Sequence, residues 1–380
     1  MGFALSKSTA WNLRVAIPFY LAGLFICCMF CHGELARLKP QPRLLTRFYL
    51  MVSSGGALGA IFVGVIAPRA FNSPMELPVG LLACSLLLLF VSYGHPVTDV
   101  AWSAVVIFLM VITGLAWQTS GDRVVVRNFY GALRVREYGE QDERFRVLIN
   151  GTIVHGGQFT SPRLSRQAAT YYSPESGIGQ AMSVQCRSAR RVGVIGLGVG
   201  TLAAYGRRGD YFRFYEINPL VVQLARAEFR FLADSAATID VVLGDARLSL
   251  ERERSQQFDM LVVDAFSGDS IPVHLLTREA LKLYFLHLKP SGLLAVHVSN
   301  NYLNLPPVVA AVAESFRGRE ALLIENKGDG KRSSPSGWVL VFDDRKAPAV
   351  DALTRAGKPI RTSGTYLWSD DYSSLLRVLN

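Results

Sequence analysis

The chain has 380 residues, of which 40 are basic and 30 acidic, so its formal net charge is +10 at neutral pH. Half of the residues are hydrophobic, which excludes an intrinsically disordered chain, because such chains lack the apolar side chains that build a core. Residues 121–380 carry 33 basic and 27 acidic side chains. So small an excess over so long a segment makes no basic stripe, and we expect no nucleic-acid partner.

Residues 1–120 differ in kind from the remainder. Four apolar stretches, each about long enough to cross a bilayer, lie near 13–31, 48–67, 77–93 and 100–117. A cleavable signal peptide would account only for the first stretch. The sequence therefore predicts a transmembrane domain of about four α-helices over residues 1–120, with buried helices of a soluble protein as the alternative.

The next expected segment is a small β-strand subdomain over residues 121–170. Three runs rich in β-branched and aromatic residues, at 123–127, 132–136 and 144–149, are typical of short strands. Turns are expected at Tyr130-Gly131 and at Asn150-Gly151.

A glycine-rich turn is the most informative feature of residues 171–380. An apolar run enters a turn with Gly196, Gly198 and Gly200, a helix-like segment follows, and a second apolar run ends in Glu216. Glycine lets a backbone approach a ligand closely, and an acid at this distance can accept both hydroxyls of a ribose. The pattern predicts a nucleoside-binding site, and a tight structural turn is the alternative.

Two later acids follow apolar runs in the same way. Asp245, with Ala246 after it, comes just past a third run, and Asp264 ends a fourth. In an open parallel sheet these strand ends form one crevice, although any single acid could be a helix cap. Gly-Asp-Ala looks like the adenine-contacting position of S-adenosylmethionine-dependent enzymes. A nicotinamide enzyme would more often have a third glycine at position 201, which is threonine here. We therefore expect an α/β Rossmann-like domain of the S-adenosylmethionine-methyltransferase type over residues 171–380.

The order of these motifs resembles spermidine synthase, the polyamine aminopropyltransferase, and more closely the membrane-fused bacterial members of that family. The resemblance covers roughly residues 121–320. It includes the Asn-Gly turn, His155-Gly156-Gly157-Gln158, the Tyr-rich turn Tyr171-Tyr172, the glycine turn, Glu216-Ile217-Asn218-Pro219, Gly244-Asp245-Ala246 and the Asp264 loop.

The resemblance implies a role for each of these positions. Gln158, Glu216 and Ile217 would hold an S-adenosylmethionine or decarboxylated S-adenosylmethionine cofactor with the glycine turn, and Asp245 and Ala246 would surround the adenine. Asp264 would orient the attacking amine and accept its proton, which makes it the expected catalytic residue. The expected substrate-binding residues are His155, Tyr171, Tyr172, Asp269 and Asp371. His297 lies within an apolar run and is interpreted as structural.

Two positions depart from the family. Val199 stands where the glycine turn usually carries an acid, and Ser267 stands where the loop after Asp264 usually ends in one. Each lost carboxylate removes a partner for an ammonium group. Asp269, Glu175, Asp370 and Asp371 are the acids available to compensate.

The sequence thus predicts a membrane-anchored transferase that moves an aminopropyl group to a small-molecule amine and releases methylthioadenosine. Methyl transfer, cleavage of the sulfonium compound and a non-catalytic nucleoside sensor are the alternatives. No zinc-ligand spacing is present, and a homo-oligomer is possible. Basic residues around the apolar stretches are nearly balanced between the two sides. The cofactor decides the orientation: we expect a multi-pass protein of the bacterial inner membrane whose catalytic domain is cytoplasmic.

Overall fold

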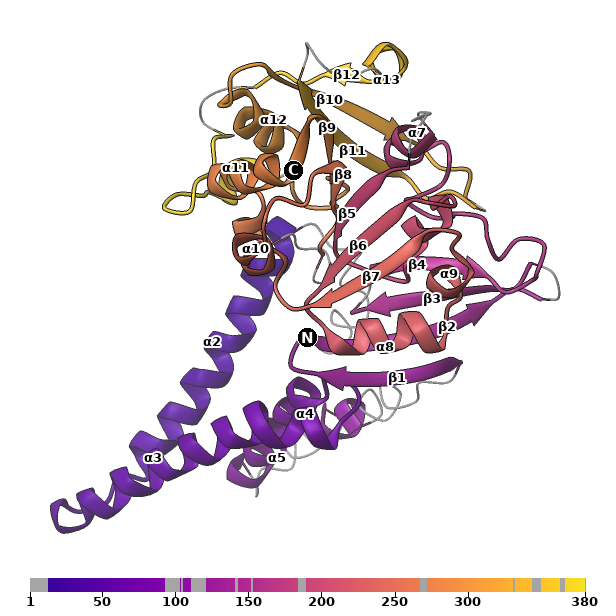
Figure 1. The fold of residues 1–380 in the computed structure, drawn as a ribbon. Coiled ribbons are helices and arrows are strands. Elements are labelled where there is room, and N and C mark those ends of the chain that lie inside the picture. The colour runs from indigo at the N-terminus through magenta and orange to yellow at the C-terminus, as the bar shows by residue number, and fades with distance from the viewer. Residues whose placement is uncertain are drawn as a thin grey trace. The chain divides into compact units, whose positions relative to one another are not determined.

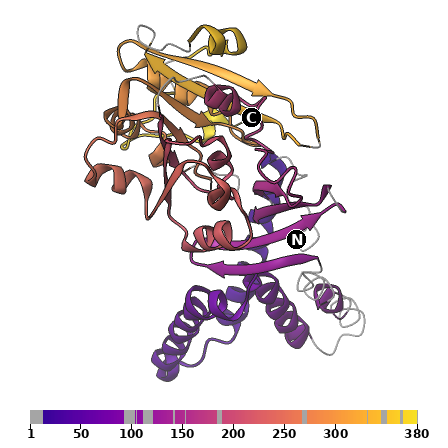
Figure 2. The same cartoon turned by 45° about the vertical axis from the view of Figure 1, so that its right-hand side comes forward.

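The computed structural model describes residues 13–92, 103, 105–110, 121–140, 143–151, 153–183, 189–266, 272–330, 332–343, 350–362 and 366–379. The chain divides into two compact units, Met1–Ala132 and Leu133–Asn380. We call them the N-terminal unit and the C-terminal unit and describe each by itself (Figures 1 and 2).

The N-terminal unit is mainly helical. Its described elements are α2 (Leu13–Arg37), η2 (Pro42–Leu44), α3 (Leu45–Ile61), η3 (Phe62–Ile66), α4 (Ala67–Ala70), α5 (Glu76–Ser92) and strand β1 (Asp122–Asn128). Arg127 of β1 forms an ion pair with Glu76 and donates from Nη1 to the carbonyl of Ser73 at 3.0 Å. These contacts tie the strand to the beginning of α5.

Two helical segments of this unit, Ile17–Arg37 and Pro42–Ala70, are long and apolar enough to cross a membrane. A third apolar helix, Glu76–Val91, is shorter. The fourth expected stretch, 100–117, lies largely outside the described residues, so the described part of the chain has two candidate spans and not four. Large apolar side chains on α2, such as Leu24, Phe25 and Ile26, are more than half exposed.

A small sheet has the order β1-β2-β3-β4, in which β3 pairs antiparallel with both β2 and β4. Its other strands are β2 (Gly131–Tyr138), β3 (Phe145–Asn150) and β4 (Ile153–Phe159). The three expected strands are therefore present; β1 and β2 are longer than their apolar runs, and β3 has the same length as its run, displaced by one residue. The fourth strand contains His155 and Gln158, for which no strand was expected; its two glycines hid the pattern.

The large sheet of the C-terminal unit has the order β12-β10-β11-β9-β8-β5-β6-β7. Its strands are β5 (Arg191–Ile195), β6 (Tyr211–Glu216), β7 (Thr238–Leu243), β8 (Phe258–Val263), β9 (Leu288–His297), β10 (Arg319–Asn326), β11 (Ser336–Asp343) and β12 (Lys358–Pro359). Strands β5 to β9 are parallel, whereas β11 is antiparallel to both β9 and β10. The expected Rossmann-like α/β domain is confirmed.

Helices cover both faces of this sheet. The helical elements of the unit are α7 (Gly177–Ser183), η5 (Thr201–Tyr205), α8 (Pro219–Ala227), α9 (Phe231–Asp234), α10 (Ala246–Arg252), η6 (Val273–Leu275), α11 (Arg278–His287), α12 (Pro306–Glu314), α13 (Val350–Ala356) and η8 (Leu376–Val378). Figure 1 shows α10, α11 and α12 along one face, where Leu250, Tyr284 and Val309 belong to one apolar core cluster.

One helix is shorter than the sequence predicts. The helix expected after the glycine turn is only the 3₁₀ turn η5, because ten residues separate Gly200 from Tyr211; Gly206 ends the turn in an extended conformation and Gly209 has a positive φ. After β6, residues 228–230 separate α8 from α9.

Candidate cofactor and catalytic site

The glycine turn lies at the centre of the carboxyl edge of the parallel strands. Strand β5, which leads into the turn, is flanked by β8 on one side and β6 on the other. Gly196 donates its N–H to Tyr215 at 2.9 Å, and Asp264 donates its N–H to Ile195 at 2.8 Å. The strand order reverses at β5, and such a reversal is where open α/β sheets form their ligand crevice.

The glycines of this turn are required first by packing within the chain. Gly196, Gly198 and Gly200 all have positive φ, a conformation that other residues rarely adopt. A Cβ at Gly196 would lie 2.2 Å from the carbonyl oxygen of Asp264, and one at Gly198 would lie 2.7 Å from that of His155. The turn is therefore held against the loop that begins at Asp264 and against strand β4, which contains His155.

Glu216 ends β6 with its carboxylate turned toward the glycine turn. Oε2 accepts the N–H of Leu197 at 3.0 Å, and Oε1 accepts the N–H of Asn218 at 2.8 Å. The residue is 8% exposed, and burial raises the pKa of this carboxyl above its ordinary value. An ionised carboxylate accepts about four hydrogen bonds, so acceptor sites remain for ribose hydroxyls. Ile217, the next residue, is 43% exposed and offers an apolar surface.

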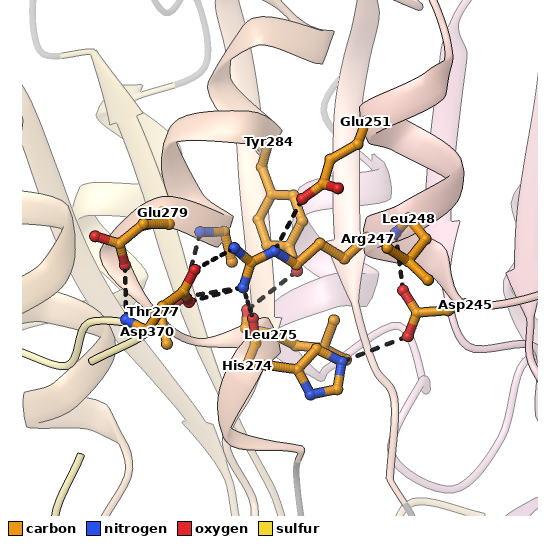
Figure 3. Close-up of polar contacts among 11 residues, drawn as sticks. Asp245, Arg247, Leu248, Glu251, His274, Leu275, Thr277, Glu279, Tyr284 and Asp370 are labelled. Carbon is orange, nitrogen blue, oxygen red and sulfur yellow. Dashed lines mark hydrogen bonds and ion pairs between the residues drawn. The ribbon is translucent and has the colours of Figure 1, made fainter. Parts of the chain in front are cut away.

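Asp245 follows β7 and caps α10. Its Oδ1 accepts the N–H of Leu248 at 2.8 Å, while Oδ2 lies 3.4 Å from Nε2 of His274 (Figure 3). Ala246 is the first residue of α10 and is buried. The helix-cap alternative is therefore realised, and it leaves Oδ2 available to a ligand that displaces His274.

Hydrogen bonds from Arg247 and Thr277 to Asp370, here called the clasp, hold the C-terminal segment against α10 beside Asp245. Arg247 donates from Nη1 to Oδ1 of Asp370 at 2.8 Å and to the carbonyl of His274 at 2.9 Å, as Figure 3 shows. Thr277 donates to the same Asp370 oxygen at 2.7 Å. These bonds lower the pKa of Asp370 to about 2. With its charge neutralised by Arg247, Asp370 is not free to hold an ammonium group.

A surface cavity of about 710 Å³ opens along this clasp. It is lined by Asp245, Arg247, Leu248, Glu251, Val273, His274, Thr277, Ser369, Asp370 and Ser373. Since Asp245 is the residue expected to contact adenine, the cavity lies at the adenine end of the expected cofactor site.

Asp264 follows β8 and is bonded through both carboxylate oxygens. Oδ2 accepts the hydroxyl of Tyr172 at 2.5 Å, and Oδ1 lies 2.7 Å from Nδ1 of His297. Its side chain is only 9% exposed. Burial and the neighbouring Asp264 raise the pKa of Tyr172 well above its ordinary value, so the phenol stays protonated and donates.

Sequence reasoning interpreted His297 as structural and so missed its contact with Asp264. A signal was present, because Val263 and Val296 pair across the parallel strands β8 and β9. The next residues in each chain segment, Asp264 and His297, then lie side by side at the carboxyl edge of the sheet. An acid that ends one apolar run and a histidine near the end of a later one are therefore candidates for a pair.

Aromatic rings surround the Asp264–His297 pair. Trp338 is stacked on His297 with ring centroids 4.4 Å apart, and Phe266 meets the imidazole edge-on at 5.0 Å. Tyr171 and Tyr172 lie 5.5 and 6.5 Å from the same ring. The two tyrosines expected to bind substrate thus lie beside His297, and Tyr172 also donates to Asp264.

His155 lies in β4 close to this group. Its Nε2 atom is buried and has no hydrogen-bond partner among the described residues. Burial lowers the pKa of His155 to about 4, against an opposing effect of Asp264 and with a smaller contribution from His297. The ring is therefore neutral at pH 7 and has an unused nitrogen.

Other expected site residues have partners elsewhere or lie outside the description. Gln158 is buried and uses both ends of its amide, donating to Ser165 O at 2.7 Å and accepting from Arg230 N at 2.8 Å. Val199 is 1% exposed and packs toward Gly156. Asp371 and Glu175 are exposed on the surface, whereas Ser267 and Asp269 lie outside the described residues.

Parts of the chain are similar to known proteins. The polyamine aminopropyltransferase of Vibrio vulnificus is 33% identical over 112 residues, which cover 28% of this chain and 37% of that protein. The chain is similar to the polyamine aminopropyltransferase family. An N-terminal histidine N-methyltransferase of Emericella nidulans is 32% identical over 113 residues, covering 28% of this chain and 20% of the relative.

A solved structure, a probable spermidine synthase from Corynebacterium glutamicum, is similar with a TM-score of 0.47 at 17% identity, over 61% of this chain and 86% of that one. No protein-family model matches the chain. The chain spans between about a fifth and a half of the length of the curated relatives that it matches.

Proposed function

We propose that this protein is a membrane-anchored transferase that uses an S-adenosylmethionine-type cofactor and moves its aminopropyl group to an amine. One observation carries the proposal. A nearly buried carboxylate, Asp264, lies next to the glycine turn, while a second, Glu216, lies on the opposite side of that turn. The first is suited to receive a proton and the second to hold a ribose.

Cofactor binding would be divided between three strand ends. Glu216 would accept the ribose hydroxyls, Ile217 would contact one face of the adenine, and Asp245 would accept from its exocyclic amine through Oδ2. The cofactor supplies a sulfonium whose neighbouring carbon is open to displacement. The protein's part is to hold that carbon in line with the nucleophile.

The reaction needs an amine with a free electron pair. A C–N bond forms as the C–S bond breaks, the sulfur keeps the bonding electrons, and methylthioadenosine leaves. The nitrogen then gives up one proton, which Asp264 is placed to take. His155 is neutral at pH 7, because burial lowers its pKa to about 4, and it therefore adds no positive charge beside the amine.

Membrane attachment is part of the proposal. It is supported by the two apolar helical segments Ile17–Arg37 and Pro42–Ala70 and by the exposed apolar side chains of α2. Because adenosyl sulfonium compounds are made and kept in the cytoplasm, we propose that the catalytic domain faces that side.

Replacing Asp264 tests the chemistry. Asp264→Asn keeps the shape but removes the charge, so turnover should fall about 10²–10⁴-fold, while the affinity for methylthioadenosine changes little. Asp259→Asn, at the other end of β8, is the matched control, since Asp259 accepts the N–H of Arg191 at 2.8 Å and contacts no expected site residue. Wild-type turnover by Asp264→Asn would show that Asp264 is only a strand-end residue.

Methyl transfer is the second candidate, favoured by the match to the N-terminal histidine N-methyltransferase. The sulfur product separates the two reactions. Methylthioadenosine indicates aminopropyl transfer or cleavage, whereas S-adenosylhomocysteine indicates methyl transfer. A protein that binds methylthioadenosine but turns over no cofactor with any amine would instead be a nucleoside sensor.

A further inference from the structure

The strongest unexplained feature of the site is the histidine behind its expected catalytic carboxylate. We infer that His297 is a positioning residue: by donating a hydrogen bond from Nδ1 it holds the Asp264 carboxylate in the orientation that receives the proton of the substrate amine. The inference rests on the proposed function, which gives Asp264 its role as proton acceptor. The hydrogen bond between His297 and Asp264 is independent of that function.

The partners of the ring assign its hydrogen. An ionised carboxylate only accepts hydrogen bonds, so at 2.7 Å from Asp264 Oδ1 the Nδ1 atom of His297 carries a hydrogen. On the other side, Nε2 lies 2.8 Å from the hydroxyl oxygen of Ser299. That oxygen accepts the N–H of Gly337 at 2.8 Å, which leaves its own hydrogen available to Nε2.

The imidazole is fixed in the plane that this bond requires. His297 pairs with Trp338 across β9 and β11, and the two rings are stacked at an interplanar angle of 9°. Trp338 is fully buried, and its Nε1 donates to the carbonyl of Tyr171 at 3.2 Å. With one face against Trp338 and Nε2 held by Ser299, the ring has little freedom to rotate away from Asp264.

Two donors therefore determine the orientation of Asp264. Tyr172 holds Oδ2 and His297 holds Oδ1, so the carboxylate cannot rotate without losing one bond. Each oxygen keeps a further lone pair for the amine. A misplacement of about 1 Å of a group that acts in the reaction can cost about 10²-fold in rate. Removal of the His297 donor should therefore lower turnover without altering the cofactor-binding strand ends.

Two substitutions separate positioning from packing. Asn carries its amide nitrogen one bond beyond Cγ, as His carries Nδ1, whereas Gln carries it one bond further, as His carries Nε2. His297→Asn thus keeps a donor for Asp264, and His297→Gln keeps more volume and a group that can reach Ser299. If His297 positions Asp264, Asn is the better replacement; if it only fills the core, Gln is.

The measurement is methylthioadenosine release by the full chain in detergent, with S-adenosylmethionine or decarboxylated S-adenosylmethionine and a panel of amines that includes putrescine. We expect kcat to fall about 10²-fold in His297→Gln and no more than about tenfold in His297→Asn. Methylthioadenosine affinity by calorimetry should stay within about threefold of wild type in both. His287→Gln is the control for loss of a buried histidine, since His287 is 2% exposed and lies at the end of α11.

A His297→Gln variant at least as active as His297→Asn, or parallel loss of turnover and ligand binding in both, would overturn the inference. If the wild-type protein releases no methylthioadenosine with any pair of cofactor and amine, the proposed function fails. A second measurement then tests whether His297 donates to Asp264. Nitrogen-15 NMR of histidine-labelled full chain should show His297 protonated at Nδ1, with a change in that signal in Asp264→Asn. A bare Nδ1 would refute the positioning bond independently of any activity.

Discussion

Glu216 offers the sharpest test of the cofactor site. Its carboxylate accepts two backbone N–H groups, from Leu197 and Asn218, which leaves about two acceptor positions for the ribose hydroxyls. In Glu216→Gln one oxygen becomes an NH₂ group that cannot accept. Loss of a hydrogen bond to a charged acceptor costs about 1.5–3 kcal/mol, so methylthioadenosine should bind about 12- to 140-fold more weakly.

The same substitution also affects folding, and a control is needed to separate the two effects. The new NH₂ group faces a backbone N–H, which should lower the free energy of unfolding by about 1–3 kcal/mol. Asp210 lies just before β6 and accepts the N–H groups of Arg190 and Arg207 at 2.9 and 3.1 Å. Asp210→Asn should therefore destabilise the fold at least as much while leaving methylthioadenosine affinity unchanged. Equal affinities of wild type and Glu216→Gln by calorimetric titration would remove Glu216 from the site.

The pH dependence of Glu216 has a definite sign. Burial raises its pKa above 4.5, so the folded state holds the proton more tightly than the unfolded state does. The resulting stability is fully present below about pH 4.5 and is lost as the pH rises through the folded-state value. Ligand binding runs the other way, because the protonated group has fewer acceptor sites. The affinity of the wild type for methylthioadenosine should therefore decrease as the pH is lowered through this window, and that of Glu216→Gln should not.

Three further outcomes are expected. Because the pKa of His155 is lowered to about 4, the free energy of unfolding should decrease as the pH falls from about 6.5 toward 4. In His155→Gln, the free energy measured by urea unfolding should depend less on pH across that range. Asp370→Asn should expose the C-terminal segment to limited proteolysis, because the clasp to Arg247 is lost, whereas the exposed neighbour Asp371→Asn should not. Because Val199 is buried and apolar where the family that the sequence resembles carries an acid, spermidine formation from decarboxylated S-adenosylmethionine and putrescine should be slow. Intact S-adenosylmethionine, whose carboxylate offsets its ammonium, should be used better and would transfer its 3-amino-3-carboxypropyl group with release of the same methylthioadenosine. A kcat/KM near ~10⁴ M⁻¹s⁻¹ for spermidine formation would contradict this.

The sequence predicted the parts of the site that depend on local pattern. Gly196, Glu216, Asp245 and Asp264 each follow an apolar run, and the parallel sheet places them at one edge as expected. The helix after the glycine turn was overestimated, because apolar spacing does not reveal how early Gly206 and Gly209 turn the chain.

The parts that depend on distant pairing were not predicted. His297 and Asp264 are 33 residues apart in sequence, and their bond requires both the adjacency and the register of β8 and β9. Arg247 and Asp370 are separated by 123 residues, and only tertiary packing brings them together. Long side chains on surface helices have many possible partners, so their pairing leaves no periodic signal.

The placement of β11 bears on how this domain is assembled during synthesis. β11 is inserted between β9 and β10, so β10 leaves the ribosome before the strand that joins it to the sheet exists. The ring that supports His297, Trp338, arrives on that late strand, as does the Gly337 N–H that holds Ser299. A nascent chain can therefore complete the strand ends that carry Glu216 and Asp245 before His297 is braced against Asp264, so the proposed proton acceptor reaches its final geometry only after β11 has been synthesised.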